Sequence, residues 1–160
     1  MKIPAYVFFA IFLFFGACQP PQPKSAEKAD RPKARPDAEW QKTLNEKEYE
    51  IMVRQGTEPP FRNAYWDNHR AGSYLSAATG DTLFRSTDKF DSGTGWPSFT
   101  QAADSSKVEI REDRSLGMTR YEVIEKSTGL HLGHVFDDGP KPAGKRYCIN
   151  SAALRFVPQK

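Results

Sequence analysis

The sequence predicts a mainly β domain of mostly antiparallel strands, preceded by a helical segment. Two observations predict this fold class. One segment with helical periodicity, residues 45–56, comes early in the domain. From about residue 73 onward, short segments that alternate apolar and polar residues follow one another, separated by turns and loops with glycine or proline. One helix followed by a series of strands favours a domain of antiparallel sheet.

The start of the chain predicts an export signal. Residues 3–17 (IPAYVFFAIFLFFGA) are almost wholly apolar and follow a single lysine, Lys2. The stretch is short for a membrane span and ends in small residues, which favours a secretory signal peptide. Its end, FFGAC, resembles the lipobox of bacterial lipoprotein signals. We therefore expect residues 1–17 to be a lipoprotein signal peptide and Cys18 to be lipidated. The alternative is a cleaved signal next to an incidental cysteine.

Residues 18–39 are expected to be the lipidated cysteine and a flexible tether, and residues 40–160 a single folded domain. The tether is rich in Pro, Ala and charge, and it holds almost nothing that could be buried. Such a tether suits a domain anchored by lipid to a membrane of the bacterial cell envelope and facing the periplasm. Gln19, in place of the Asp that often signals inner-membrane retention, favours the outer membrane.

Charge and cysteine content narrow the function of the domain. Residues 1–47 carry eight Lys/Arg against five Asp/Glu, which leaves fifteen of each in residues 48–160. With no basic surplus, the domain is not expected to bind nucleic acid. The chain has two cysteines. If Cys18 is acylated, Cys148 has no partner within the chain, and an unpaired thiol is unusual in an exported protein.

The helix is expected over residues 45–56 (NEKEYEIMVRQG). Asn45 can cap it, Glu48 completes a capping-box pattern, and Gly56 is a plausible stop. The apolar residues at helical spacing are Tyr49, Met52 and Val53. Two prolines in TEPPF then break the chain.

The strand candidates follow in order. SYLSAATGDTLFRS holds two short strands joined by a Thr-Gly-Asp turn, and KVEIRED and GMTRYEVIEKSTG each alternate apolar and polar residues. HLGHVFDDG and RYCINSAALRFVP complete the series, joined by the loop GPKPAGK. The chemistry-bearing side chains fall mainly in these last two segments.

The strand RYCINS predicts a reactive thiol. Alternate residues of a strand share a face, so Arg146, Cys148 and Asn150 point the same way. A neighbouring cation stabilises the thiolate and is expected to lower the thiol pKa. The alternative is a buried structural cysteine, a common fate for a free thiol. Arg and Asn on the same face argue against an apolar core, which favours the reactive thiol.

His131 and His134 are three residues apart and would face opposite sides of a regular strand. A bulge at Gly133 would turn both imidazoles to one face. The alternative is a pair of unrelated histidines.

In DSGTGWPSF, two glycines and a proline constrain a loop that holds Trp96. Trp96 is either a packing residue or an aromatic wall for a small apolar substrate group.

The segments GWPSF, HLGHVFDDGP and RYCINSAALRF, in this order, closely resemble the signature segments of the B-type methionine sulfoxide reductases. GTEPPF and YWDNH also look like family segments, so the resemblance covers about residues 44–157. It implies two antiparallel β-sheets with a helical N-terminal segment. It also implies reduction of the R epimer of methionine sulfoxide in oxidised proteins and peptides.

The resemblance assigns roles to the singled-out residues. Cys148 matches the nucleophile, Trp96 the residue that lines the pocket for the substrate methyl group, and His131 and His134 the pair that binds and protonates the sulfoxide oxygen. The positions that support this site match Asn150, Arg146 and Asp138. These roles suit the chemistry, since a thiolate that attacks a sulfoxide needs an acid near the oxygen.

Two departures from the family pattern change the expected chemistry. Many members hold a structural zinc on two Cys-x-x-Cys pairs, and no thiolate stands at the matching positions, so no zinc or other cofactor is expected. Those positions are Ser76, Thr79, Glu125 and Thr128. Many members also carry a resolving cysteine where this chain has Thr94. The oxidised enzyme should therefore depend on an external thiol such as a thioredoxin-like protein. We expect a monomer.

Two other classes stay open on the sequence alone. His131, His134 and Cys148 are a set that could ligate zinc or copper in a metal-binding module. A non-catalytic binder of oxidised methionine segments would keep the pocket but not turn over. Stoichiometric metal in the pure protein would favour the first, and a turnover assay separates the second from an enzyme.

Overall fold

The computed structural model describes residues 31–160, apart from the side chain of Leu116. The expected signal peptide, Cys18 and the tether up to residue 30 lie outside the described residues. In residues 31–160, none of the helices has the length and apolar character needed to cross a bilayer.

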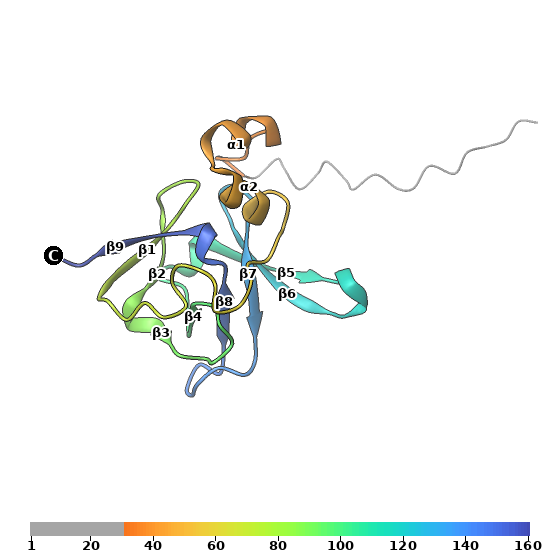
Figure 1. The fold of residues 1–160 in the computed structure, drawn as a ribbon. Coiled ribbons are helices and arrows are strands. Elements are labelled where there is room, and N and C mark those ends of the chain that lie inside the picture. The colour runs from red at the N-terminus through yellow and green to blue at the C-terminus, as the bar shows by residue number, and fades with distance from the viewer. Residues whose placement is uncertain (1–30) are drawn as a thin grey trace, which may run out of the picture.

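The described residues form two antiparallel β-sheets, as the sequence and its family resemblance predicted (Figure 1). One sheet has three strands in the order β2-β1-β9, and the other has six in the order β3-β4-β8-β7-β6-β5. The strands are β1 Gly72–Ser76, β2 Thr82–Arg85, β3 Lys89–Phe90, β4 Ser98–Phe99, β5 Val108–Asp113, β6 Arg120–Glu125, β7 His131–Phe136, β8 Arg146–Ile149 and β9 Leu154–Pro158. The sheet order places β7 and β8, which carry most of the predicted site, side by side within the larger sheet.

Two short helices precede the sheets, α1 (Asp37–Thr43) and α2 (Glu46–Met52). The capping box predicted for α2 is present. The Asn45 side chain accepts from the Glu48 amide, and the Glu48 carboxylate accepts from the Asn45 amide, each at 2.9 Å. These bonds satisfy two backbone donors that a helix start leaves open.

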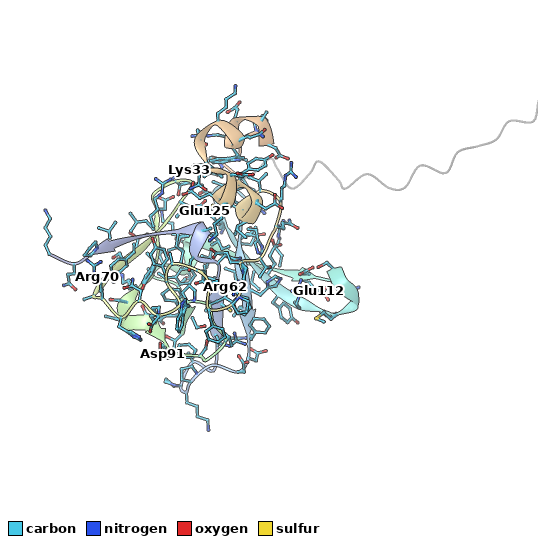
Figure 2. The ribbon with its side chains drawn as sticks, viewed as in Figure 1. Lys33, Arg62, Arg70, Asp91, Glu112 and Glu125 are labelled. Carbon is cyan, nitrogen blue, oxygen red and sulfur yellow. The ribbon has the colours of Figure 1, made fainter. Side chains whose placement is uncertain are left out.

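Contacts with the domain begin before the expected boundary at residue 40. The amide of Lys33 donates to the carbonyl of Ser127 at 2.9 Å, and Arg31 reaches the carboxylate of Glu109 at 3.2 Å. Trp40 of α1 is 2% exposed, with the guanidinium of Arg35 over its ring. Figure 2 shows Lys33 beside the helices. Residues 31–39, expected as tether, therefore lie against the folded domain.

An aromatic cluster joins the two sheets. Tyr74 of β1 and Phe84 of β2 come from the smaller sheet, and Phe99 of β4 from the larger one; all three are fully buried. The rings of Phe84 and Phe99 stack at 4.5 Å, and Tyr74 meets Phe99 edge-on at 5.1 Å. Burial of one such side chain contributes roughly 1.5–3 kcal/mol. The cluster fixes β4, and β4 in turn borders the strand of Cys148.

Candidate active site

Cys148 lies in a row of side chains that crosses the larger sheet. On β8 it is paired with Ser98 of β4 on one side and with His134 of β7 on the other. The row continues through Glu122 of β6 to Arg111 of β5. Residues directly opposite in antiparallel strands project from the same face, so the thiol and the imidazole of His134 share one face of the sheet.

A bulge in β7 brings the second histidine to this face. Val123 is paired with Gly133, but the next residue, Ile124, is paired with His131, so Leu132 is the extra residue. The ring centroids of His131 and His134 lie 5.5 Å apart. The sequence predicted a bulge at Gly133; the structure has the bulge one residue earlier, at Leu132, and both imidazoles lie on one side as expected.

Gly133, next to the bulge, must be a glycine because β7 and β8 approach closely there. A Cβ atom at this position would stand 2.1 Å from the carbonyl oxygen of Cys148 and 2.9 Å from the Cα of Ile149. The absence of a side chain therefore allows β7 to lie against the backbone of the cysteine itself.

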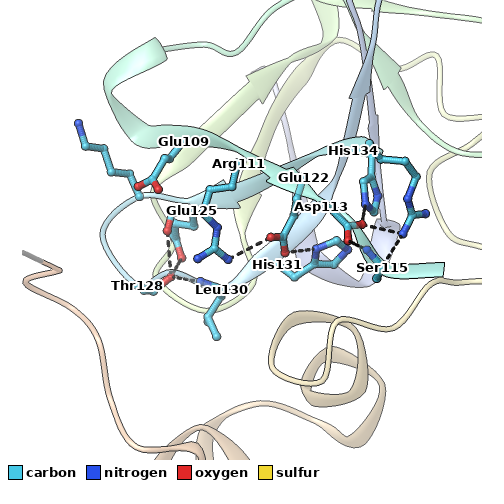
Figure 3. Close-up of polar contacts among 12 residues, drawn as sticks. Glu109, Arg111, Asp113, Ser115, Glu122, Glu125, Thr128, Leu130, His131 and His134 are labelled. Atoms are coloured by element: carbon cyan, nitrogen blue, oxygen red, sulfur yellow. Dashed lines mark hydrogen bonds and ion pairs between the residues drawn. The ribbon is translucent and has the colours of Figure 1, made fainter. Parts of the chain in front are cut away.

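Each histidine is held by a carboxylate (Figure 3). The Nδ1 of His131 lies 2.8 Å from Oε1 of Glu122, and both residues are buried. Burial disfavours the charged form of Glu122 and by itself would raise the pKa of that carboxyl. The hydrogen bond to His131 and the charges of His131 and Arg111 outweigh this effect, so the pKa is lowered. Glu122 therefore stays ionised and fixes the orientation of the His131 ring.

The Nε2 of His134 lies 2.9 Å from Oδ2 of Asp113, which also accepts from Arg120 at 2.7 Å. Bonds from Ser115 and then from His134 hold the pKa of Asp113 well below its usual range. Burial lowers the pKa of His134, and its bond to Asp113 opposes this shift. Glu122 and Asp113 were not identified from the sequence as site residues.

Asn150 and Trp96 lie around the same site and both bond to Glu58. Asn150, 3% exposed, accepts from the Glu58 amide at 3.1 Å, while its Nδ2 donates to the Leu132 carbonyl and lies 3.5 Å from Nε2 of His131. The indole Nε1 of Trp96 donates to the carbonyl of Glu58 at 2.9 Å. The amide, both imidazoles and the indole are thus positioned by contacts within the domain.

Cys148 is half-buried, and its pKa differs from the sequence expectation. Burial raises the pKa of the thiol, while the Thr94 hydroxyl, Arg146 and Ser98 act in the opposite direction without overcoming it. The expected lowering by the neighbouring cation is therefore wrong in its net sign. The guanidinium of Arg146 is shared with Asp138 through two bonds of 2.8 Å, which reduces its effect on the sulfur.

A cleft opens beside the histidines. It is lined by His131 and His134 on one side and by residues of β5, β6 and their connection, including Arg114 and Ser115, on the other. Its volume is about 540 Å³. In Figure 1 the β5–β6 hairpin projects from the body of the domain. The cleft borders the face that carries the imidazoles, and neither Cys148 nor Trp96 is among the residues that line it.

The four positions that match the zinc ligands of the resembled family gather in one cluster. The hydroxyls of Thr79 and Thr128 donate to the two oxygens of Glu125, which is 1% exposed, and Ser76 accepts from the amides of Ala78 and Thr79. Figure 3 shows the contact between the Glu125 carboxylate, at the end of β6, and Thr128. Among residues 31–160, no group of three or more His, Cys, Asp or Glu has a geometry that could hold a metal ion.

Comparison with known proteins identifies relatives. Residues 44–158 match the SelR domain. The chain is 51% identical to a peptide methionine sulfoxide reductase MsrB of Thiobacillus denitrificans over 81% of this chain and 97% of the relative. It is 47% identical to an MsrB of Methanosarcina barkeri over 83% and 89%. It is 51% identical to a peptide methionine sulfoxide reductase MsrA/MsrB of Vibrio cholerae over 78% of this chain, but spans only 33% of that longer protein.

Proposed function

The chain belongs to the SelR domain family and is a peptide-methionine (R)-S-oxide reductase, and from this premise we propose how its residues act. Cys148 is the nucleophile. His131 and His134 bind the sulfoxide oxygen and supply its proton, Trp96 holds the methyl end of the substrate, and Asn150 orients His131. Arg146 and Asp138 support the strand and loop around the thiol.

The proposed reaction transfers one oxygen atom. The Cys148 thiolate attacks the sulfoxide sulfur and forms a sulfur–sulfur bond, while the bond from that sulfur to oxygen breaks and the doubly protonated oxygen leaves as water. Attack of this water on the Cys148 sulfur then breaks the sulfur–sulfur bond, so that methionine leaves, one proton is released and Cys148 becomes a sulfenic acid. The substrate sulfur gains two electrons and the cysteine sulfur loses two. The proton that leaves the thiol balances the proton on the sulfenic acid, so the step consumes no external acid.

The pairing of Cys148 with His134 across two adjacent strands is the observation that best supports this proposal. It sets a nucleophile and a proton donor on one face, and the bulge at Leu132 adds His131 to them. Because burial raises the pKa of the thiol, we propose that Cys148 rests as the thiol and passes its proton to the site as it attacks.

The test is reduction of a peptide with racemic methionine sulfoxide, with dithiothreitol as reductant. The R epimer should disappear and the S epimer remain. Cys148→Ser should abolish turnover while the circular dichroism spectrum stays that of the native fold, since serine is close in size. A serine variant that retains near-native turnover would remove Cys148 as the nucleophile.

We also propose that the enzyme is a single-cysteine form that binds no zinc. Cys148 is the only cysteine among residues 31–160, so an external thiol, for example of a thioredoxin-like protein, recycles the sulfenic acid. Two thiols reduce it to the thiol, releasing one water and forming one disulfide. The hydroxyls around Glu125 are poor zinc ligands and already bond to the Glu125 carboxylate or to backbone amides. Zinc at one equivalent in the purified protein would contradict the second part.

Finally, we propose that the enzyme is a lipoprotein of the bacterial cell envelope, anchored through Cys18. The apolar residues 3–17 and the FFGAC sequence support this, as does the charged, proline-rich segment that follows. Gln19, in place of the Asp that often signals inner-membrane retention, favours an outer-membrane location facing the periplasm, where oxidised proteins or peptides would be its substrates.

A further inference from the structure

One buried carboxylate touches the proposed site without belonging to it. Glu58 lies in the irregular segment after α2 and is 2% exposed. Its backbone makes two of the bonds already described, one from its amide to Asn150 and one to its carbonyl from the indole of Trp96. A single residue therefore bonds to the amide beside His131 and to the ring proposed to hold the substrate methyl group.

The bond to Asn150 determines which way its amide faces. The Glu58 amide can only donate, so it selects the Oδ1 atom of Asn150. This leaves Nδ2 for the carbonyl of Leu132 and for Nε2 of His131. If the Glu58 backbone moved away, a flipped Asn150 would point an oxygen at the Leu132 carbonyl, and the donor toward His131 would be lost.

The side chain of Glu58 fixes where this backbone lies. Its Oε2 accepts from the amide of Ala152 at 3.1 Å, and the ammonium of Lys47 on α2 lies 2.6 Å from Oε1. The Lys47 side chain is 56% exposed and that of Glu58 is 1% exposed, so the ion pair joins a surface ammonium to a buried carboxylate. A buried carboxylate needs such partners, because an unpaired charge in the interior is strongly unfavourable.

We propose that Glu58 is a positioning residue that holds Asn150 and Trp96 in register, and that Lys47 is its charge partner. This inference rests on the proposed roles of Asn150 and Trp96. It extends the machinery of the reaction to α2, a helix that contributes no group to the reacting atoms. Through Glu58, Lys47 of α2 affects both Trp96, which binds the substrate methyl group, and Asn150, which orients His131.

The test compares Glu58→Gln, Glu58→Ala and Lys47→Met in the full chain, kept in mild detergent. The substrate is a methionine sulfoxide peptide, with dithiothreitol as reductant. A displaced Trp96 weakens substrate binding and a displaced Asn150 slows the chemical step, so KM should rise and kcat should fall together. We expect kcat/KM to fall about tenfold in Glu58→Gln and Lys47→Met and about a hundredfold in Glu58→Ala.

A second readout needs no turnover. In nitrogen-15 spectra, the indole N–H resonance of Trp96 should shift, and its exchange with deuterium should become faster, in all three variants. Glu50→Gln is the matched control, because it makes the same change on α2 in an exposed pair with Arg54. It should leave KM, kcat and the indole resonance unchanged.

The double variant Lys47→Met, Glu58→Gln tests the pairing. If the two charges act together, the double variant loses no more kcat/KM than the worse single variant. Multiplied losses would overturn the partnership, and an unmoved Trp96 resonance with native KM in Glu58→Ala would overturn the positioning role. A reduced kcat with a native KM would also contradict the positioning role, because a smaller fraction of folded protein lowers the apparent kcat without changing KM. A wild-type protein without reductase activity would instead overturn the proposed function.

Discussion

At the scale of single residues, the surroundings of Cys148 balance opposing effects on its ionisation. Burial raises the pKa of the thiol, and the hydroxyl of Thr94, 3.9 Å from the sulfur, is the first of the groups that lower it. Ser92 bonds to both Thr94 and Ser98, which keeps their hydroxyls in place beside the sulfur. Thr94, which stands where members of the resembled family often carry a resolving cysteine, thus places a hydroxyl beside the sulfur.

Thr94→Val should therefore raise the pKa of Cys148 further, by about one unit, the size expected for one hydrogen bond to a charged group. Below the pKa, the thiolate fraction and the rate of iodoacetamide labelling should fall about tenfold. The measurement is the labelling rate of Cys148 as a function of pH. Thr94→Ser keeps the hydroxyl and should label at close to the native rate; equal losses in both variants would contradict this role.

Asp113 should control the protonation of His134. Burial lowers the pKa of this imidazole, Asp113 raises it, and the charge of Arg120 lowers it. Asp113→Asn removes the carboxylate charge, which is the one effect among these three that favours the imidazolium. The pKa of His134 should therefore fall further, by about one unit. Since the proposed acid must be protonated, kcat near neutral pH should drop and its decline with rising pH should begin at lower pH.

The His134 titration followed by NMR and the pH profile of kcat check this expectation. A pKa that falls in the titration without any shift in the kcat profile would show that His134 is not the acid, and would leave that role to His131.

The sequence identified the groups proposed to react but not the carboxylates that hold the histidines. Glu122 and Asp113 occur in RYEVIE and VEIRED, where polar residues alternate with apolar ones as on any strand with one face in water. Only the pairing of β5, β6 and β7 shows that this polar face borders the site. The sign of the Cys148 pKa shift also needed the structure, because burial is not visible in a local sequence.

At the scale of elements, the bulge of β7 carries a prediction of its own. Gly133→Ala places a Cβ 2.1 Å from the carbonyl oxygen of Cys148, so β7 and β8 must separate. The overpacking should lower the free energy of unfolding by about 1–3 kcal/mol or more. Turnover should fall further than stability alone explains, because both the bulge and Cys148 are displaced.

Gly144→Ala is the control. Its φ of 67° makes a side chain unfavourable there, but no atom lies within 4 Å of the added Cβ. It should cost about 1 kcal/mol through the backbone alone and leave kcat native. Urea unfolding and turnover of both variants make the comparison. A Gly133→Ala enzyme with native turnover would show that the close approach is not needed.

The longer strands and α2 were predictable because their patterns are local, as alternation in β5 and β6, as a turn between the two short strands β1 and β2, and as a capping box in α2. The strands β3 and β4 have two residues each, too few for alternation to be recognised. Their pairing depends on β8 and on the burial of Phe99. The helix α1 lies in a segment rich in proline and charge, and packing of Trp40 in the core accompanies it.

At the scale of the whole molecule, the cysteine content governs recycling. Reduced enzyme mixed with excess substrate and no reductant should stop after one turnover with one added oxygen at Cys148, which dimedone should trap. Intact mass gives the result directly. Loss of two hydrogens, with Cys148 joined to Cys18 in one chain, would show that the N-terminal segment delivers a resolving thiol and that Cys18 is not acylated.

The anchor is tested by fractionation. Cys18→Ala should move the protein from the membrane fraction to the soluble fraction of the expressing cells, because acyl chains on Cys18 provide the attachment in the proposed lipoprotein. Ser92→Ala, far from the leader in sequence, should stay with the membrane like the native chain. A Cys18→Ala protein that remains in the membrane with residues 1–17 uncleaved would mean that the apolar leader itself is the anchor.

The cluster around Glu125 has a consequence for survival under oxidants. Its four side chains, Ser76, Thr79, Glu125 and Thr128, contain no sulfur. A zinc site made of thiolates is oxidised by peroxide and hypochlorite and then loses its metal. The oxidants that convert methionine to its sulfoxide would therefore also unfold a reductase that depended on such a site. Hydroxyls and a carboxylate are inert to such agents. This cluster should therefore stay intact under the oxidants that produce the substrate. Cys148 is then the group that has to be reduced again after oxidation.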